Sequence, residues 1–397
     1  MTSAPAVTAS VVICVYTDKR WDDIVRAVAS VQAQDVTAAE TIVVVDHNPD
    51  LLARAAAAFT GPGVRVLPNA HRQGLSGARN TAVTEAVGEV IVFLDDDAEA
   101  RPGWLAALLA PYADPTVVGV GGVAHPRWPT NRPRVLPGDA PYDPDATGEL
   151  DWIVGCTYTG QPRTQAEVRN LMGCNMSFRR EVFERVGGFA EDIGRIGKNP
   201  LGCEETELCI RARQVYRRAG QEIRIVFEPA AVVDHRVSDD RVEWAYLRRR
   251  SWSEGLSKAA VSKLVGAGDG LATERSYVAK VLPTAVLREL KEGRVSSAAA
   301  VVTALAFTSA GYVRGKLPGA TAGVRLPAAA ESGAPAPGSA VGQNLAAQTP
   351  TTPTPTTPAP VADAPAAPAI PPSPSPAASA PAAAESAPAG PSPDHGA

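Results

Sequence analysis

The first hundred residues alternate between short runs of β-branched residues and longer stretches with helical spacing. Two runs predict buried strands, at residues 11–16 and 41–45; a short third strand is predicted at 63–67 and a fourth strand at 90–94. Three stretches between them predict helices, at residues 21–34, 51–59 and 76–87, the last with Ser76 as its N-cap. Strands that alternate with helices in this way predict an α/β domain with a mainly parallel, doubly wound sheet.

The pattern becomes less regular after residue 104. A predicted helix at 104–112 and a predicted strand at 117–123 precede a long loop over 125–150, which is rich in Pro, Gly and Asp. Further helices are predicted at 179–186 and 204–219, and strands at 223–227 and 230–233. From residue 242 to 316 the chain is mainly helical, which predicts C-terminal helices that extend the α/β domain.

One segment of this extension raises the question of a membrane. Residues 297–313 are uncharged and mostly apolar, and they lie between Arg294 and Arg314. The stretch is at the short limit for crossing a bilayer, and its Ala, Ser and Thr residues make it weakly hydrophobic, which favours a buried or interfacial helix. The cationic flanks suit peripheral contact with an anionic membrane at its inner face; a helix packed on the α/β domain with solvated cations is the alternative.

Composition separates the end of the chain from the rest. Residues 327–397 hold 18 of the 36 prolines, no aromatic residue and no Lys or Arg. Such a segment cannot bury enough apolar surface to offset the entropy lost on ordering. We therefore expect an α/β domain over residues 1–240, a helical extension over 241–326, and a disordered Pro/Ala/Ser/Thr-rich tail over 327–397.

Charge and cysteine content exclude several classes of protein. The tail carries four acidic residues, so the remaining 38 balance all 38 basic residues, and a neutral folded part gives no electrostatic reason to bind nucleic acid. The five cysteines are odd in number and none has CxxC spacing, which predicts neither a zinc knuckle nor a disulfide framework. With no secretory signal pattern in residues 1–10, a reduced, cytoplasmic setting is expected.

Acidic residues stand directly after two of the predicted strands. Asp46 follows the second strand, and Asp95, Asp96 and Asp97 follow the fourth. In open α/β sheets, ligands bind outside the carboxyl ends of the strands. Three adjacent carboxylates repel one another unless a cation lies among them, which indicates a site for Mg²⁺ or Mn²⁺ shared with substrate phosphates. A solvated acidic turn is the alternative interpretation.

A glycine-punctuated loop enters the predicted helix at 76–87. Gly74 and Gly77 let the backbone approach a ligand closely, and a helix N-terminus favours anions. Arg79 could reach a diphosphate or pair with a carboxylate at the strand ends. The GxGxxG fingerprint is absent, so a nicotinamide cofactor is not implied.

Two further places combine residue types that carry chemistry. Glu204 and Glu205 begin the predicted helix at 204–219, where the helix dipole explains acidic residues but where a general base would also be well placed. His235 follows the last predicted strand. A lone histidine is commonly a core or surface residue, yet neutral imidazole ligates transition metals and suits Mn²⁺ better than Ca²⁺.

These motifs, in this order and at this spacing, resemble the family 2 glycosyltransferases, inverting enzymes with the GT-A fold. The resemblance covers residues 9–240. Its landmarks are the opening strand, Val45-Asp46-His47-Asn48, Gly74-Leu75-Ser76-Gly77-Ala78-Arg79-Asn80, Phe93-Leu94-Asp95-Asp96-Asp97, Gly173-Cys174-Asn175-Met176-Ser177-Phe178-Arg179-Arg180, Gly187-Gly188-Phe189 and Cys203-Glu204-Glu205-Thr206-Glu207-Leu208.

The resemblance implies roles for the acidic residues at the strand ends. Asp46 takes the position that holds the nucleotide base or ribose. The family's DxD motif corresponds to Asp95 and Asp97, with Asp97 on the metal and Asp95 nearer the ribose, while Asp96 also fits a ligand position. Arg79 is expected in the donor site.

The resemblance also implies a catalytic base and a second metal ligand. The family usually places the aspartate of a Glu-Asp pair where this chain has Glu205, which keeps the carboxylate and adds one methylene of reach. Glu204 is the alternative base. His235 matches a histidine that some GT-A enzymes supply to the metal, and residues 173–180 match the segment that lines the donor-sugar and acceptor site.

Together these features predict a metal-dependent glycosyltransferase that moves a sugar from a nucleotide-sugar donor to an acceptor hydroxyl with inversion. The acceptor could be a glycan, a lipid-linked molecule or a small molecule. A nucleotidyltransferase is one alternative, although the loop at 16–21 lacks the glycine such enzymes carry after the first strand. A non-catalytic nucleotide-sugar-binding protein is the other, although Asp46, Asp95, Asp97 and Glu205 are all retained.

Overall fold

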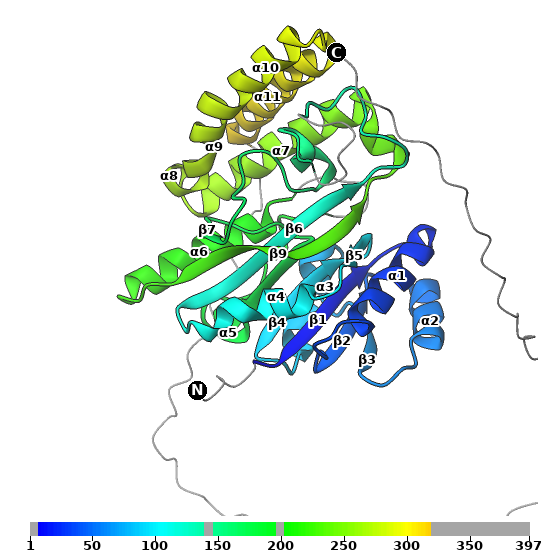
Figure 1. Ribbon diagram of the computed structural model, residues 1–397. Helices are drawn as coiled ribbons and strands as arrows, with labels where there is room; N and C mark the ends of the chain where they lie inside the picture. The colour runs from blue at the N-terminus through cyan, green and yellow to red at the C-terminus, as the bar shows by residue number, and fades with distance from the viewer. Residues whose placement is uncertain (1–6, 139–145, 196–201, 319–397) are drawn as a thin grey trace, which may run out of the picture. The chain divides into compact units, whose positions relative to one another are not determined.

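The computed structural model describes residues 7–138, 146–195 and 202–318. Within them a nine-stranded sheet carries helices on both faces, and a group of helices follows it in the chain (Figure 1). This architecture confirms the predicted α/β class with its C-terminal helices. The predicted tail at 327–397 and the end of the predicted extension, 319–326, lie outside the described residues.

The sheet has the strand order β3-β2-β1-β4-β8-β6-β9-β5, and β7 pairs with β9 outside this path. Its strands are β1 (Ala9–Val15), β2 (Glu40–Val45), β3 (Val64–Pro68), β4 (Val90–Asp95), β5 (Ala98–Ala100), β6 (Val117–Arg127), β7 (Ala166–Glu167), β8 (Asn175–Arg179) and β9 (Arg224–Arg236). The four strands predicted in the first hundred residues, β1 to β4, are all present and pair in parallel.

The directions of the strands beyond β4 depend on β8, an antiparallel strand that the sequence pattern did not predict. β8 pairs antiparallel with β4 on one side and with β6 on the other, and β6 then pairs parallel with β9. Two reversals return the direction, so β6 and β9 run the same way as β4. Their carboxyl ends therefore reach the same edge of the sheet as the end of β4.

Alternate side chains of the central strands feed two separate cores. In β1, Val11 and Ile13 belong to the core on one face and Val12 to the core on the other, as expected for a strand buried on both sides. One face is covered by α1 (Trp21–Gln32), α2 (Pro49–Ala58) and α4 (Trp104–Leu109). The opposite face is covered by α3 (Leu75–Glu85), α5 (Arg180–Val186) and α6 (Glu204–Arg218).

The C-terminal helices form a third packed group. They are α7 (Trp244–Leu264), α8 (Ala267–Gly270), α9 (Ala272–Ser276), a π-helical turn (Tyr277–Val281), α10 (Leu282–Lys291) and α11 (Val295–Lys316). The helices α7 and α11 cross at Gly255 and Gly311: a Cβ on Gly255 would lie 2.1 Å from the Thr308 carbonyl oxygen, and one on Gly311 would lie 2.2 Å from that of Trp252. Only glycine allows this approach.

Three local predictions need correction. The N-cap of α3 is Gly74, and the Ser76 hydroxyl instead donates to the Ile193 carbonyl, because the segment after α5 lies against the start of α3. The two strands predicted at 223–227 and 230–233 are one continuous strand, β9. The loop expected from residue 125 begins later, since β6 pairs with β9 through Arg127.

Candidate functional site

Asp46 lies at the carboxyl end of β2 and is held from two sides. One carboxylate oxygen accepts a 2.7 Å hydrogen bond from the Asn69 side-chain amide, and the other accepts a 3.0 Å bond from the backbone N–H of Gly74. The next residue, His47, has a left-handed backbone with φ 49°. Non-glycine residues adopt this conformation rarely, and such strain concentrates at functional sites.

The end of β4 brings three potential metal ligands together. The short strand β5 begins one residue after Asp97 and pairs with β9, so that Ala98 lies opposite His235. As a result, Asp97 Oδ1 lies 3.3 Å from His235 Nε2. One ligand atom from each of Asp95, Asp97 and His235 can be chosen so that all three lie within 4.8 Å of one another.

The ring of His235 is positioned by residues 155 and 156. Its Nδ1 atom lies 3.7 Å from the Cys156 sulfur, which leaves Nε2 to face Asp97. Gly155 has a φ of 85°, and a Cβ at this position would lie 3.2 Å from the imidazole. A side chain here would therefore crowd the ring and strain the backbone.

Two arginines that the sequence analysis did not single out face the acidic triplet. Arg20 NH1 lies 2.7 Å from Asp96 Oδ1 and 3.1 Å from Asp97 Oδ2, and Arg241 NH2 lies 3.3 Å from Asp97 Oδ2. Arg20 ends a short 3-10 helix (Asp18–Arg20) after β1, and its place soon after the first strand is the sequence signal that could have marked it. Arg241 lies in a short turn after β9, and no local motif marks it.

Burial and these cations give the neighbouring carboxyl groups of Asp96 and Asp97 different pKa values. Burial raises the pKa of Asp96 to about 7; Arg20 opposes this rise, and repulsion from Asp97 and Asp95 adds to it. Burial acts in the same direction on Asp97, but His235, Arg20 and Arg241 hold its pKa well below the usual range. Asp97 is therefore the carboxylate that stays ionised, and Asp96 keeps a buried oxygen without a hydrogen-bond partner among the described residues.

Arg79 joins the end of β4 to the beginning of α6. Its side chain is only 2% exposed; NH1 donates to Glu204 at 2.7 Å, and NH2 donates to the Gly173 carbonyl at 2.8 Å and lies 3.5 Å from Asp95 Oδ1. Of the two roles considered for Arg79, the pairing with a strand-end carboxylate is the one that these contacts provide. Contact with a donor diphosphate stays a prediction.

The two glutamates at the start of α6 have different surroundings. Glu204 is buried against Arg79, whereas Glu205 is half-buried and no Lys or Arg is paired with it among the described residues. Burial, followed by repulsion from Glu204, raises the pKa of Glu205 to about 8. Cys203, the residue before the pair, has a left-handed φ of 71°, the second such non-glycine residue at this edge after His47.

The helical extension supports this turn of α6 directly. The Ser257 hydroxyl of α7 accepts a 3.0 Å hydrogen bond from the Gly202 N–H, and the Cys203 thiol donates to Glu254 at 3.5 Å. Arg250 and Lys258 in turn pair with Glu254 at 2.7 and 3.1 Å. The backbone that presents the two glutamates is therefore fixed by α7.

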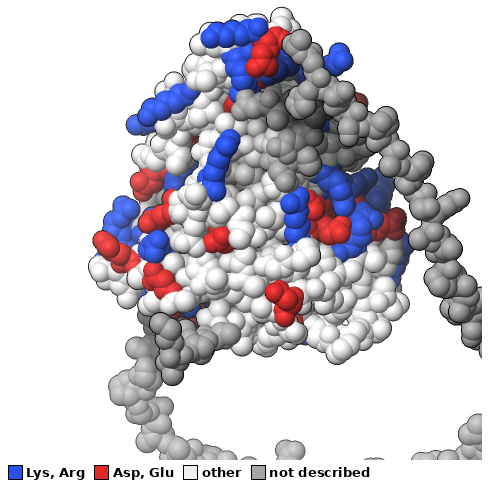
Figure 2. All heavy atoms as spheres, in the orientation of Figure 1, with Lys and Arg blue, Asp and Glu red and all other residues white. Residues whose placement is uncertain are grey.

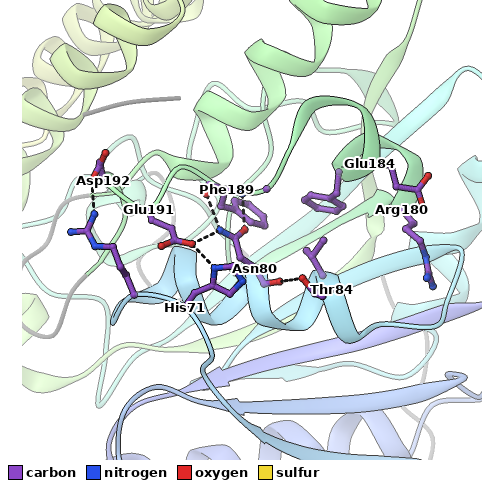
Figure 3. Close-up of a pocket in the computed structure, with 12 residues that line it drawn as sticks. His71, Asn80, Thr84, Arg180, Glu184, Phe189, Glu191 and Asp192 are labelled. Carbon is purple, nitrogen blue, oxygen red and sulfur yellow. Dashed lines mark hydrogen bonds and ion pairs between the residues drawn. The ribbon is translucent and has the colours of Figure 1, made fainter. Parts of the chain in front are cut away.

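A separate cavity of about 670 Å³ lies beside α3 and α5, and none of the eight predicted site residues lines it. Its polar side chains bind one another: Figure 3 shows Asn80 bonded to the Phe189 backbone and to Glu191, which also pairs with His71 at 2.8 Å. These contacts hold the segment after α5 against α3. The cavity is therefore separate from the predicted site residues.

The structure thus gathers most of the predicted residues in two connected clusters. Asp95, Asp97 and His235 form one, with Asp96 beside them, and Glu204 and Glu205 form the other, with Arg79 between the two. Asp46 is anchored to Gly74, one residue before α3, the helix that carries Arg79. The arrangement can hold a divalent cation beside a carboxylate of raised pKa.

Comparison with known proteins gives a family match. The model of the family "Glycosyl transferase family 2" matches residues 10–187. A glucosyl-dolichyl phosphate glucuronosyltransferase of Haloferax volcanii is 31% identical over 317 residues, which cover 78% of this chain and 96% of that protein. A pre-mycofactocin glycosyltransferase of Mycobacterium tuberculosis is 28% identical over 180 residues, covering 43% of this chain and 32% of that protein.

Solved structures include a similar mannosyltransferase from Pyrobaculum calidifontis in complex with GDP-Man and Mn²⁺. The similarity covers 77% of this chain and 88% of that chain, with 20% sequence identity and a TM-score of 0.49.

Proposed function

This chain is a GT-A enzyme of glycosyltransferase family 2 that transfers a sugar from a nucleotide-sugar donor to an acceptor, and we propose that the sugar is of the hexose type and that the transfer inverts its configuration. The observation that carries the proposal is the position of Glu205. It lies at the start of α6, joined through Glu204 and Arg79 to Asp95 at the end of β4. An acceptor between the two clusters would meet a base on one side and the donor on the other.

We propose that Asp97 and His235 hold Mg²⁺ or Mn²⁺. The donor set of carboxylate oxygen and imidazole nitrogen suits Mn²⁺. Its two atoms are 3.3 Å apart, close to the roughly 3 Å between neighbouring ligands of an octahedral ion. When bound, the ion supplies Lewis-acid stabilisation of the charge that builds up on the leaving diphosphate.

Glu205 is the proposed general base. It removes the proton from the acceptor hydroxyl as the oxygen attacks the anomeric carbon, so the sugar is transferred in one displacement and its configuration inverts. A pKa of about 8 places this carboxyl near working pH, where general bases are most effective. Glu204 is less suited, because one of its oxygens is bonded to the buried Arg79.

The remaining acids are assigned to the donor. Asp46 would accept hydrogen bonds from the base or ribose, held in place by Asn69 and Gly74. Asp95 and Asp96 would contact the ribose and diphosphate side of the donor. Arg79 is proposed to act through others: it positions Glu204 and Asp95, so its role in the donor site is indirect.

The acceptor is proposed to be lipid-linked. The relative from Haloferax volcanii is named for a dolichyl-phosphate-linked sugar substrate, and this chain covers 96% of its length. A nucleotidyltransferase has no support in the family match, and the non-catalytic alternative would require that Glu205 and Asp97 persist without use.

Product analysis tests the proposal. A panel of UDP-, GDP- and dTDP-sugars is screened with Mn²⁺ for thermal stabilisation, and the stabilising donor is incubated with short-chain lipid-linked sugars. We expect NMR of the new glycosidic bond to show the anomeric configuration opposite to that of the donor. Retained configuration would exclude Glu205 as the base of a single displacement, and donor binding without any transfer or hydrolysis would favour the non-catalytic alternative.

A further inference from the structure

One side of α11 is an uninterrupted apolar stripe that no described residue covers. Its members are all exposed and follow one another every three or four positions: Val295, Ala299, Val302, Ala306, Ala310 and Val313. At 100° per residue they fall within one narrow sector along the whole helix. We call them the α11 stripe.

The stripe belongs to a wider concentration of exposed apolar side chains. Nine of the twelve large hydrophobic residues that are exposed among the described residues lie after residue 244, including Leu287 and Leu290 on α10. Scattered apolar residues on a surface need no explanation, whereas a concentration of this kind marks an interaction site.

The same region is strongly positive. Residues 244–318 contain twelve Lys and Arg but five Asp and Glu, within a folded part whose total charge is zero. Figure 2 shows Lys and Arg side chains prevailing over the part of the surface where α10 and α11 lie. At the two ends of α11, Lys291, Arg314 and Lys316 are exposed, and no carboxylate among the described residues is paired with them.

We propose that the α11 stripe and these end cations seat the enzyme on an anionic membrane surface. An apolar face with cationic residues beside it suits the boundary between acyl chains and anionic headgroups. A second copy of the chain is a poorer partner: cations lie at both ends of the stripe, so either direction of pairing would bring like charges together.

The helix lies on the membrane rather than across it. α11 has 22 residues and enough hydropathy to span a bilayer, but its opposite side carries Gly311 and Gly315, which pack against α7 too closely for a Cβ. Spanning would separate α11 from α7 and expose this face. The contact with α7 is kept when only the stripe enters the headgroup region.

The orientation of α11 on the membrane indicates how a lipid-linked acceptor would reach the site, an inference that rests on the proposed function. α7 contacts α11 through Gly255 and, along the same helix, holds Gly202 and Cys203 through Ser257 and Glu254. The helix that lies on the membrane is therefore rigidly connected to the turn that presents Glu205. A lipid-linked acceptor would reach the site with its lipid still in the bilayer.

Vesicle co-sedimentation of the full-length protein tests the membrane contact. We expect binding to phosphatidylcholine vesicles that contain phosphatidylglycerol, little binding to phosphatidylcholine alone, and release at high salt. The pair Val302→Glu with Val313→Glu and the triple change of Lys291, Arg314 and Lys316 to Gln should each weaken binding roughly tenfold or more. Val87→Glu, at an exposed valine of the α/β domain, is the matched control and should bind normally.

Several results would overturn the proposal. Equal binding to neutral vesicles, salt-resistant binding typical of a spanning helix, or unchanged binding of both variant sets would each do so. A dimer seen by light scattering that the stripe variant dissociates, without vesicle binding, would assign the stripe to a second copy. Transfer to a water-soluble acceptor is measured separately: vesicle binding without any transfer would refute the proposed function while leaving the membrane contact intact.

Discussion

Arg79 donates a 2.7 Å hydrogen bond to Glu204, a residue 125 positions further along the chain, and both side chains are almost completely buried. The pair connects α3 to α6 at the edge of the sheet where the acids lie. Arg79 pairs with Glu204 and not with Glu205, and no other Lys or Arg among the described residues is paired with Glu205. This contact gives the two glutamates different surroundings and supports the proposal that Glu205, rather than Glu204, is the base.

Replacing Glu205 by Gln should reduce turnover by about 10²-fold or more, the usual contribution of a general base. Donor binding should be unchanged, since the amide keeps the shape of the side chain. Turnover and the thermal shift with sugar nucleotide are measured in parallel. Glu205→Asp, which restores the family's usual residue, should retain turnover; a fully active Glu205→Gln enzyme would show that the base is another residue.

The raised pKa of Glu205 also predicts a pH effect on stability. A folded-state pKa of about 8, above the 4.5 of an ordinary glutamate, means that the folded protein binds this proton more tightly than the unfolded chain. The associated stability is complete below about pH 4.5 and is lost as the pH rises toward 8. The Tm of the Glu205→Gln variant minus that of the parent should therefore increase between pH 5 and pH 8. Each kcal/mol of stability that the parent loses over this range corresponds to a change in Tm of roughly 2–4 °C.

The same proton predicts the acid limb of the rate profile. Turnover needs the ionised carboxylate, so kcat/KM should rise with pH through a pKa well above that of an ordinary glutamate. In Glu205→Gln this limb should disappear from the residual rate. For the stability measurement, a difference in Tm between Glu205→Gln and the parent that stays constant from pH 5 to pH 8 would contradict the assignment of the raised pKa to Glu205.

Asp97→Asn should abolish both turnover and the Mn²⁺-dependent rise in Tm. The amide preserves size but removes the charge that Arg20, Arg241 and His235 surround. Asp234→Asn is the matched control, because this neighbouring acid pairs with Arg101 and lies outside the cluster. Chelator-treated parent enzyme should lose activity and recover it with Mn²⁺; full turnover after chelation would rule out the metal site.

Arg79→Met should destabilise the fold by about 3–5 kcal/mol, since it leaves Glu204 buried without its counter-charge. Adding Glu204→Gln should recover part of the loss, because the buried charge is then removed as well. Urea unfolding of the parent, the two single variants and the double variant gives the coupling energy. Additive effects would mean that the two side chains do not depend on each other.

The local pattern was sufficient to locate β1 to β4 and the three helices between them. A strand that is buried on both faces has a continuous run of apolar, mostly β-branched residues, so β1, β2 and β4 could be located from the sequence pattern alone. β8 could not, because Asn175-Met176-Ser177 mixes polar and apolar residues whose buried polar atoms find partners only in the assembled sheet. The Asn175 side-chain amide, for example, bonds to the carbonyls of Val123 and Ala231.

The residues of the site also fall into those that the sequence located and those that only the fold brings together. The sequence by itself placed Asp46 and Asp95 to Asp97 at strand ends, because parallel strands deliver their carboxyl ends to one edge. Only the tertiary structure brought His235 beside Asp97, through the reversal at β8 and the pairing of β5 with β9. It also set Arg20 and Arg241 among the acids and buried Arg79 against Glu204, since charge pairing across the fold depends on side-chain distance, which local sequence does not contain.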